Sequence, residues 1–380
     1  MPTADARPGN TPIGAPDDAA LPGAVLLQQP RRLVEVLSPM LAGWLDPGAR
    51  LVDSHVAIRR YVPGKRCICE LELVIATRPE GRANASARSS TNGEAGIAGG
   101  AGAVKVRTVI GKLYAGEEGA QVHDTLHRLW ASGFSTEPLT VPRPIAYDPD
   151  WQLLLLSRVT GTALRQLLLR QAEGGRREAE DGRLPPPASL CTAVERSAAW
   201  LVKLHTSGVT AGRRYTFDRH LHTLAHWQRR VIDVYPEAES LLATVLARIE
   251  ARGRALPAWE PAPTHRDFSP DHVVVDGARL SGLDFDEFCQ YDPLFDVAHF
   301  VAHLRLLGLT SCGMVQCFDE LATRFQMAYQ ARAQEYSAAR VRLYEAITYL
   351  KLAHIIAFIT RPRGWHQSVA TLLREAQRTV

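Results

Sequence analysis

The sequence lacks any long apolar run. Its longest candidates are residues 153–156 and 354–359, far short of the roughly 18 apolar residues that a membrane-spanning helix needs. The first 16 residues also lack a basic segment followed by an apolar one, the pattern of a secretory signal. We therefore expect a cytoplasmic protein with no membrane partner.

Cysteine is scarce, and no pair has the Cys-x-x-Cys spacing that would suggest a zinc site. Cys67 and Cys69 are two residues apart on an expected strand and so point to the same side. We expect all six cysteines to be buried thiols in a reducing compartment. They are Cys67, Cys69, Cys191, Cys289, Cys312 and Cys317.

A strong charge of either sign is also missing. The net charge of +4 is weak evidence for an anionic partner, because lysine and arginine are spread along the chain. The basic turn with Arg59, Arg60, Lys65 and Arg66 has no interleaved aromatic residues. We expect it to face the phosphates of one nucleotide, and we expect no nucleic-acid partner.

Length and composition predict an ordinary globular protein of two lobes, since 380 residues with 46% hydrophobic content can form two cores. Residues 1–24 are rich in Pro, Gly, Ala and Asp, and we expect a disordered tail. Residues 25–157 predict a β-rich N-terminal lobe, interrupted by a flexible Gly/Ala/Ser insertion at 78–103. Residues 158–380 are mainly helical in pattern. The predicted fold class is α+β.

A lysine projects from a mostly apolar strand face in the N-terminal lobe. Residues 104–115 alternate so that Lys112 shares one face with Val104, Val106, Ile110 and Tyr114. Upstream, residues 55–75 predict a hairpin about a Pro-Gly turn. Downstream, residues 116–134 have helical apolar spacing, and strands are expected within 141–161.

The stretch THRDFSPDHVVVDGARLSGLDFDEF, residues 264–288, carries the chemistry. Two short apolar runs flank an Asp276-Gly277 turn, which predicts a hairpin whose ends approach each other. Asp267, His272 and Asp284 can therefore share one site. Phosphoryl transfer needs a carboxylate for the acceptor hydroxyl, metal ligands and a cation for the phosphates, and Lys112 is a candidate for the cation.

These residues resemble the motifs of protein-kinase-like phosphotransferases of small molecules, the aminoglycoside phosphotransferase and choline kinase group. The matching elements are His265-Arg266-Asp267, His272, Asp284-Phe285-Asp286 and Tyr291-Asp292-Pro293. Similar segments outside this window are the first hairpin, the strand with Lys112, the hinge segment at 153–164 and the helix at 198–208. The resemblance implies a two-lobed kinase-like fold with a β-rich N-lobe and a mainly helical C-lobe.

By that resemblance the protein is a small-molecule kinase that uses ATP and Mg²⁺ and phosphorylates a hydroxyl of a small-molecule acceptor. Asp267 would be the catalytic residue and Asp284 a metal ligand. Lys112 would bind the α- and β-phosphates and pair with Glu118, for which Glu117 and Asp124 are rivals. The other expected nucleotide contacts are Gly64 and Lys65 at the phosphates and Ser157 to Val159 at adenine.

His272 departs from the family pattern, which usually has asparagine there. Three outcomes follow: the imidazole ligates the metal and favours Mn²⁺; the metal rests on Asp284 and waters or on neighbouring Asp271; or catalysis is weak or absent. His265 is expected to brace the loop, and Asp292 and Asp296 are expected to cap the next helix or tie down the loop.

Three other functions stay open. A nucleotide-binding pseudokinase with a protein partner would account for His272, and a nucleotidyl transferase on the same fold would release pyrophosphate. A nucleic-acid binder would show salt-sensitive binding that ATP does not compete with. Residues 318–380 hold five acids against nine lysines and arginines, which mildly disfavours a polycationic aminoglycoside as the acceptor.

Overall fold

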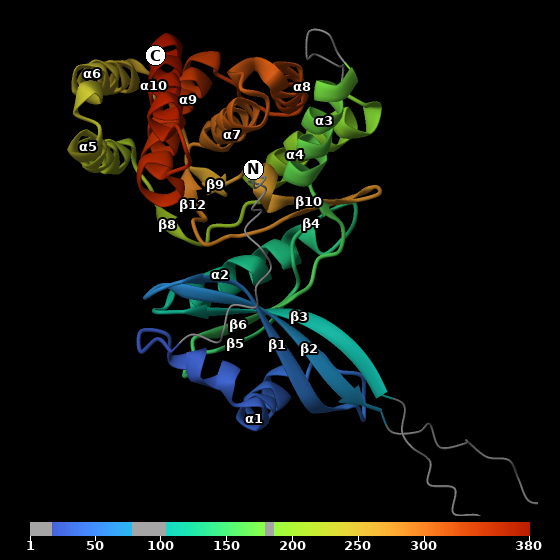
Figure 1. The fold of residues 1–380 in the computed structure, drawn as a ribbon. Coiled ribbons are helices and arrows are strands. Elements are labelled where there is room, and N and C mark those ends of the chain that lie inside the picture. The colour runs from blue at the N-terminus through green and yellow to red at the C-terminus, as the bar shows by residue number, and fades with distance from the viewer. Residues whose placement is uncertain (1–16, 78–103, 179–185) are drawn as a thin grey trace, which may run out of the picture. The chain divides into compact units, whose positions relative to one another are not determined.

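The computed structural model describes residues 17–77, 104–178 and 186–380, which form two compact units (Figure 1). Unit 1 comprises Met1–His123 with Arg143–Arg158, and unit 2 comprises Asp124–Pro142 with Val159–Val380. The predicted insertion at 78–103 and most of the predicted tail lie outside the described residues. Residues 17–24 are described, and Leu21 is buried.

Unit 1 is built on an antiparallel sheet with the strand order β1-β2-β3-β6-β5. The predicted hairpin is confirmed, and Gly64 adopts a φ of 66° in its turn, a conformation that favours glycine. The strands are β1 Arg50–Val62, β2 Arg66–Ala76, β3 Val104–Tyr114, β5 Pro144–Asp148 and β6 Leu153–Ser157.

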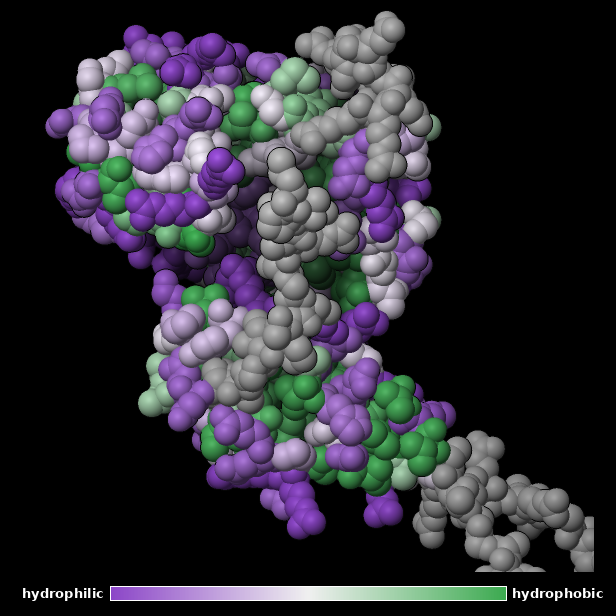
Figure 2. Space-filling view, in the orientation of Figure 1, coloured by the Kyte–Doolittle hydropathy of each residue, from purple (hydrophilic) through white to green (hydrophobic). Residues whose placement is uncertain are grey.

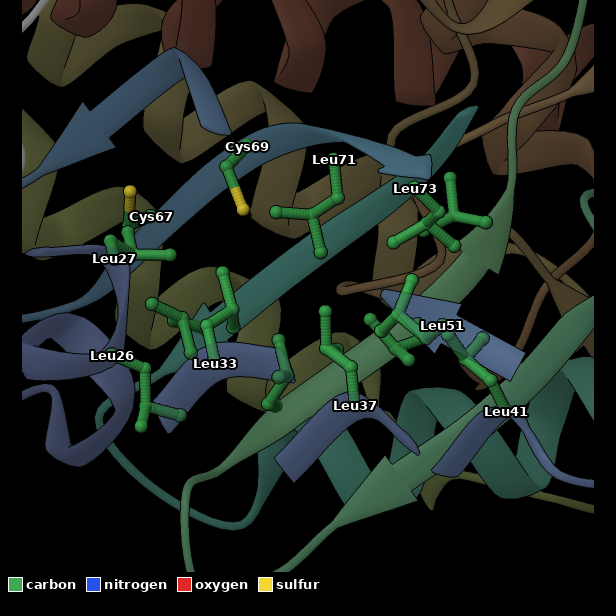
Figure 3. Packing of buried hydrophobic residues seen from close by; sticks show 14 of the residues in the cluster. Leu26, Leu27, Leu33, Leu37, Leu41, Leu51, Cys67, Cys69, Leu71 and Leu73 are labelled. Atoms are coloured by element: carbon green, nitrogen blue, oxygen red, sulfur yellow. The ribbon is translucent and has the colours of Figure 1, made fainter. Parts of the chain in front are cut away.

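One face of this sheet packs on α1 (Pro30–Leu41) and the 3₁₀ helix η1 (Pro22–Gln28) (Figure 3). The shared face predicted for β2 is confirmed, because its four alternate side chains are fully buried: Cys67, Cys69, Leu71 and Leu73. They meet the leucines that α1 presents at helical spacing, Leu33, Leu37 and Leu41. Each buried leucine stabilises the fold by about 2 kcal/mol.

Strand β3 buries only one end of its predicted apolar face. Lys112 is 5% exposed and Tyr114 3%, whereas Val104 and Val106 are each 63% exposed. After β3 comes α2 (Glu118–Leu129), which continues as one π-helical turn, η2 (Trp130–Phe134). The helix predicted over 116–134 is thereby confirmed.

Unit 2 is mainly helical, as predicted, and its most buried helices are α7 and α9. Its helices are α3 Leu164–Glu178, α4 Ala188–His205, α5 Phe217–Val234, α6 Glu239–Ala255, α7 Leu294–Cys312, α8 Asp319–Gln330, α9 Ala338–Ile355 and α10 Trp365–Thr379. Short helical turns are η3 Pro236–Ala238, η4 Pro270–His272, η5 Val315–Phe318 and η6 Ile356–Thr360. Hydrophilic residues predominate on the visible face over α5 and α6 (Figure 2).

Two small sheets of unit 2 contain the strands within and beside residues 264–288. Their orders are β4-β11-β10-β7 and β8-β12-β9. The predicted hairpin about Asp276-Gly277 is confirmed as β10 and β11, with Val273 opposite Gly282. The strands are β4 Leu139–Thr140, β7 Thr162–Ala163, β8 Arg213–Arg214, β9 Ala262–Thr264, β10 Val273–Asp276, β11 Arg279–Gly282 and β12 Cys289–Tyr291.

Two sequence expectations need correction. Cys312 and Cys317 form a disulfide, so only the other four cysteines are buried thiols. Helix α7 ends at Cys312 and the chain reverses through Gly313, whose φ is 77°, which brings the two Cα atoms to 6.3 Å. The second correction concerns long apolar segments, because the helix Ala338–Thr360 is long and apolar enough to cross a membrane. Within the protein, 72% of its apolar 18-residue stretch is buried.

Candidate active site

The loop between β9 and β10 is held by hydrogen bonds to Asp296, a carboxylate in the first turn of α7. Asp296 is fully buried and accepts hydrogen bonds from the backbone N–H groups of His265 and Arg266, both at 2.7 Å. Asp292 accepts one from the backbone N–H of Leu294 at 3.0 Å. Bonds to an ionised acceptor are stronger than neutral ones. Asp296 therefore ties down the loop, whereas Asp292 caps the start of α7, and both are structural roles.

His265 ties this loop to the segment after the hairpin. Its Nε2 donates to the carbonyl of Leu283 at 2.8 Å, and its Nδ1 accepts from the backbone N–H of Asp267 at 3.4 Å. Burial lowers the pKa of His265, so the neutral tautomer with Nε2–H is the one that fits both bonds. His265 is a structural brace, as expected.

Asp267, His272 and Asp284 come together, as the spacing predicts. His272 Nδ1 lies 3.7 Å from Asp267 Oδ2, and His272 Nε2 lies 3.6 Å from Asp284 Oδ2. The backbone N–H of Leu283 donates to the carbonyl of His272 at 2.8 Å, joining the two loops. Asp284 has a φ of 64° and Arg266 one of 67°, left-handed conformations that are uncommon for non-glycine residues and are often found at functional sites.

The hydrogen bond of His272 determines which ring nitrogen carries a proton and which has a lone pair for a metal ion. Its Nδ1 lies 2.7 Å from the carbonyl oxygen of Asp267, which can only accept, so Nδ1 carries a proton. In the neutral ring, Nε2 then presents a lone pair on the side of Asp284. A backbone carbonyl that fixes the tautomer in this way is the usual support of a histidine ligand.

Asp284 and His272 form a donor set of two side chains. Within the described residues, no group of three or more His, Cys, Asp or Glu side chains has the geometry to hold a metal ion. A pair fits a divalent ion whose other ligands are phosphate oxygens and water, the usual manner in which Mg²⁺ is bound beside nucleotides.

Sequence reasoning missed Lys351, which lies on α9. Its Nζ is 2.7 Å from Asp267 Oδ1 and 3.0 Å from Nε2 of His299. Burial alone would raise the pKa of Asp267, but the charge of Lys351, its hydrogen bond and the neighbouring His299 and His272 together outweigh burial and hold that pKa well below its usual value. His299 thus also contacts the site. No local pattern identifies Lys351, which is 84 residues from Asp267.

The expected nucleotide contacts lie in unit 1, apart from Val159, which follows β6. Lys112 stands opposite Leu154 of β6, with its Nζ 5.6 Å from the ring centre of Tyr114. Glu118 begins α2 and is exposed. Its carboxylate lies next to Gly116: a Cβ added to that glycine would be 2.9 Å from Oε2 of Glu118.

The turn predicted to contact phosphates already binds a carboxylate. The backbone N–H of Gly64 and the hydroxyl of Tyr61 both donate to Asp18 Oδ2 at 2.8 Å. The Gly64 hydrogen bond is the largest cause of a lowered pKa at Asp18. The backbone N–H of Lys65 donates to the carbonyl of Val62 at 3.1 Å.

The backbone of Ser157 is engaged in its own sheet. Its N–H donates to the carbonyl of Arg143 at 2.9 Å, and its hydroxyl accepts from the N–H of Arg143 at 2.8 Å. Ser157 is thereby held at the end of β6.

A cavity of about 320 Å³ opens in unit 2 beside the candidate site, with Pro270 and Asp271 in its wall. Arg165 pairs with Asp271 at 3.3 Å, and His303 also lines the cavity. The Nε2 of His303 is buried without a hydrogen-bond partner among the described residues. The remaining wall is largely apolar and includes Leu306, Leu307, Leu352 and Ile355.

Comparison of the sequence with known proteins identifies its family. The family model of a phosphotransferase enzyme family matches residues 98–342. Homoserine kinase from Pseudomonas aeruginosa is 33% identical over 147 residues, a match that covers 36% of this chain and 43% of that protein. The chain is thus matched to less than half the length of this curated relative.

Solved structures with low sequence identity share the fold. The aminoglycoside phosphotransferase APH(4)-Ia has a TM-score of 0.52 at 13% identity, covering 85% of this chain and 92% of that one. Choline kinase LicA from Streptococcus pneumoniae has a TM-score of 0.51 at 11% identity, covering 91% and 99%. With a β-sheet unit, a helical unit and a family match over more than half of its length, the chain belongs to the phosphotransferase enzyme family and has its kinase-like α+β fold.

Proposed function

We propose that this protein is a small-molecule kinase that transfers the γ-phosphoryl group of ATP to a hydroxyl of its acceptor. The observation that carries the proposal is the convergence of Asp267, His272 and Asp284 on two loops joined by a tight hairpin. Phosphoryl transfer needs little covalent chemistry from the protein, so a positioned carboxylate and a metal site are its main requirements.

In the proposed reaction, the acceptor hydroxyl donates a hydrogen bond to Asp267 Oδ2. The acceptor oxygen bonds to the γ-phosphorus as the bond from that phosphorus to the β–γ bridging oxygen breaks. The hydroxyl proton passes to Asp267, and ADP leaves with the bonding electron pair. Lysine is a suitable clamp for the non-transferred phosphates, and we assign that role to Lys112 with Glu118 as the acid that orients it.

Asp284 and Nε2 of His272 would hold the divalent ion, which supplies positive charge to the phosphate oxygens. The remaining nucleotide contacts are proposed from their position on the chain. The backbone N–H of Gly64, in place of its bond to Asp18, and the side chain of Lys65 would face phosphates, and backbone groups of Ser157 to Val159 would face adenine. These roles all rest on the family membership together with the local geometry.

The cavity supports an acceptor with an apolar portion. Its wall is largely apolar, and the charge of Asp271 is already paired with Arg165. A polycation would find no unpaired acid there among the described lining residues. We therefore propose a hydroxyl acceptor that carries at most one positive charge, such as a hydroxy amino acid or an amino alcohol.

The test measures ADP and pyrophosphate release from ATP with Mg²⁺ or Mn²⁺. The acceptor panel contains hydroxy amino acids, amino alcohols, sugars and an aminoglycoside. We expect ADP release with one of the first two classes and a loss of roughly 10²- to 10⁴-fold in Asp267→Asn. A matched control is Asp233→Asn on α5, which should retain activity.

Other outcomes would redirect the proposal. Release of pyrophosphate in place of ADP would favour a nucleotidyl transferase. ATP binding without turnover on any acceptor would favour a pseudokinase, and activity that survives Asp267→Asn would remove the assigned base.

A further inference from the structure

Lys351 contacts the carboxylate of Asp267, the proposed catalytic residue, but lies outside the residues that the family model matches. Its side chain is 21% exposed and that of Asp267 is 33% exposed, so both border solvent-accessible space. Lys351 lies on α9, beyond the matched residues 98–342. The family comparison therefore assigns nothing to it.

The proton arrangement around Lys351 follows from its neighbours. Nδ1 of His299 lies 3.0 Å from the carbonyl oxygen of Phe268, so Nδ1 carries the proton and donates. Burial, with the charge of Lys351 as the next cause, holds the pKa of His299 well below its usual value. Nε2 of His299 is thus an acceptor, and Lys351 donates one proton to it and another to Asp267 Oδ1.

This arrangement treats the two oxygens of Asp267 differently. Oδ1 is 2.7 Å from Lys351 Nζ and 3.5 Å from His299 Nε2, while Oδ2 is 3.7 Å from His272 Nδ1. His272 Nδ1 donates its proton to the backbone carbonyl of Asp267. Oδ2 is therefore the oxygen left to accept a proton from a substrate.

We propose that Lys351, itself held by His299, is a positioning residue that fixes the Asp267 carboxylate so that Oδ2 meets the acceptor hydroxyl. This inference rests on the proposed function. The terminal torsion of an aspartate is broad, so an unanchored carboxylate samples many orientations. Misplacement of a reacting group by about 1 Å can cost on the order of 100-fold in rate.

The experiment compares steady-state ADP release in the wild type, Lys351→Ala and Lys351→Arg. We expect kcat to fall about 100-fold in Lys351→Ala with the KM for ATP changed less than about threefold. Methylamine or ethylamine should restore at least about a tenth of the lost activity, because the amine can occupy the site of the missing ammonium group. Lys351→Arg should keep an intermediate kcat.

Lys203→Ala is the matched control. Lys203 is also a part-buried helical lysine, and its Nζ donates to the carbonyls of Gly133 and Leu139 at 2.9 and 2.7 Å. Any activity lost there should not respond to amines. Thermal unfolding of each variant shows that the protein is folded.

The outcomes separate the two proposals. If the wild type releases no ADP with any acceptor, both fail. If the wild type is active and Lys351→Ala keeps its kcat, or loses it without response to amines while folded, the positioning role is wrong and the kinase assignment stands.

Discussion

His272 shows how one side chain alters the chemistry available at an otherwise familiar site. Its protonated Nδ1 is held by the carbonyl of Asp267, and Nε2 lies 3.6 Å from Asp284 Oδ2. Imidazole nitrogen is a softer ligand than the amide oxygen usual in the family, and it suits Mn²⁺ better than Mg²⁺. If His272 ligates the metal as proposed, this residue sets the metal preference of the reaction.

We expect His272→Asn to shift activity from Mn²⁺ towards Mg²⁺. The asparagine amide can still donate to the carbonyl of Asp267, while its oxygen offers a harder ligand beside Asp284. The ratio of Mg²⁺- to Mn²⁺-supported kcat/KM should rise about tenfold, measured as ADP release. The exposed His222, changed to asparagine, is the control, and an unchanged ratio in His272→Asn would mean that the ring does not ligate.

The β10–β11 hairpin depends on α4 as its support. Trp200 of α4 stacks on Phe268 with ring centres 5.2 Å apart, and its Nε1 donates to the carbonyl of Thr140 at 2.9 Å. A Cβ added at Gly282 would lie 2.2 Å from Cζ2 of Trp200. The end of the hairpin that leads into Asp284 therefore requires glycine.

We predict that Gly282→Ala destabilises the protein by about 1–3 kcal/mol, since one of two packed elements must move. Differential scanning calorimetry measures the effect as a lower melting temperature. Gly174→Ala on α3 is the control, because a Cβ there meets nothing within 4 Å. Equal melting temperatures for the two variants would contradict the prediction.

The turn between β1 and β2 is occupied by a carboxylate from the segment before α1. If Gly64 contacts nucleotide phosphates, Asp18 competes for the same N–H and repels them. Asp18→Asn should then lower the KM for ATP about two- to fivefold through the loss of one negative charge. The neighbouring Asp17→Asn is the control, and a raised KM for ATP in Asp18→Asn would instead show that Asp18 orders the turn for binding.

Across the molecule, buried histidines make stability sensitive to acid. Burial lowers the pKa of His303 to about 3 and holds the pKa values of His220 and His299 well below the usual value. Below about pH 6.5 these histidines take up protons in the unfolded chain but not in the folded one. The free energy of unfolding therefore falls as pH decreases from 6.5 towards the folded pKa values.

We expect a lower melting temperature at pH 5.5 than at pH 7.5, with each of these histidines contributing about 1 kcal/mol. His303→Leu removes one of the three groups. The difference in unfolding free energy between the two pH values should shrink by that amount in chemical denaturation. A difference that stays the same in this variant would rule out His303 as a contributor.

Local pattern was enough to predict much of this protein. Alternation about a Pro-Gly turn predicted β1 and β2, helical spacing predicted α2, and a short hairpin predicted that Asp267, His272 and Asp284 lie together. Such features depend on residues close in sequence, because side chains return to the same face every two residues in a strand and every 3.6 residues in a helix. The roles proposed for the site residues came from the resemblance of their motifs to those of a known family.

Tertiary structure alone decided the contacts between distant segments. Lys351 reaches Asp267 only when α9 packs in the core of unit 2, and Asp18 reaches Gly64 only when its segment folds back on the first hairpin. The Cys312–Cys317 pairing likewise required the chain reversal after α7. Contacts of this kind form when complete helices and strands pack together. The periodicity within one helix or strand does not indicate which other element it packs against.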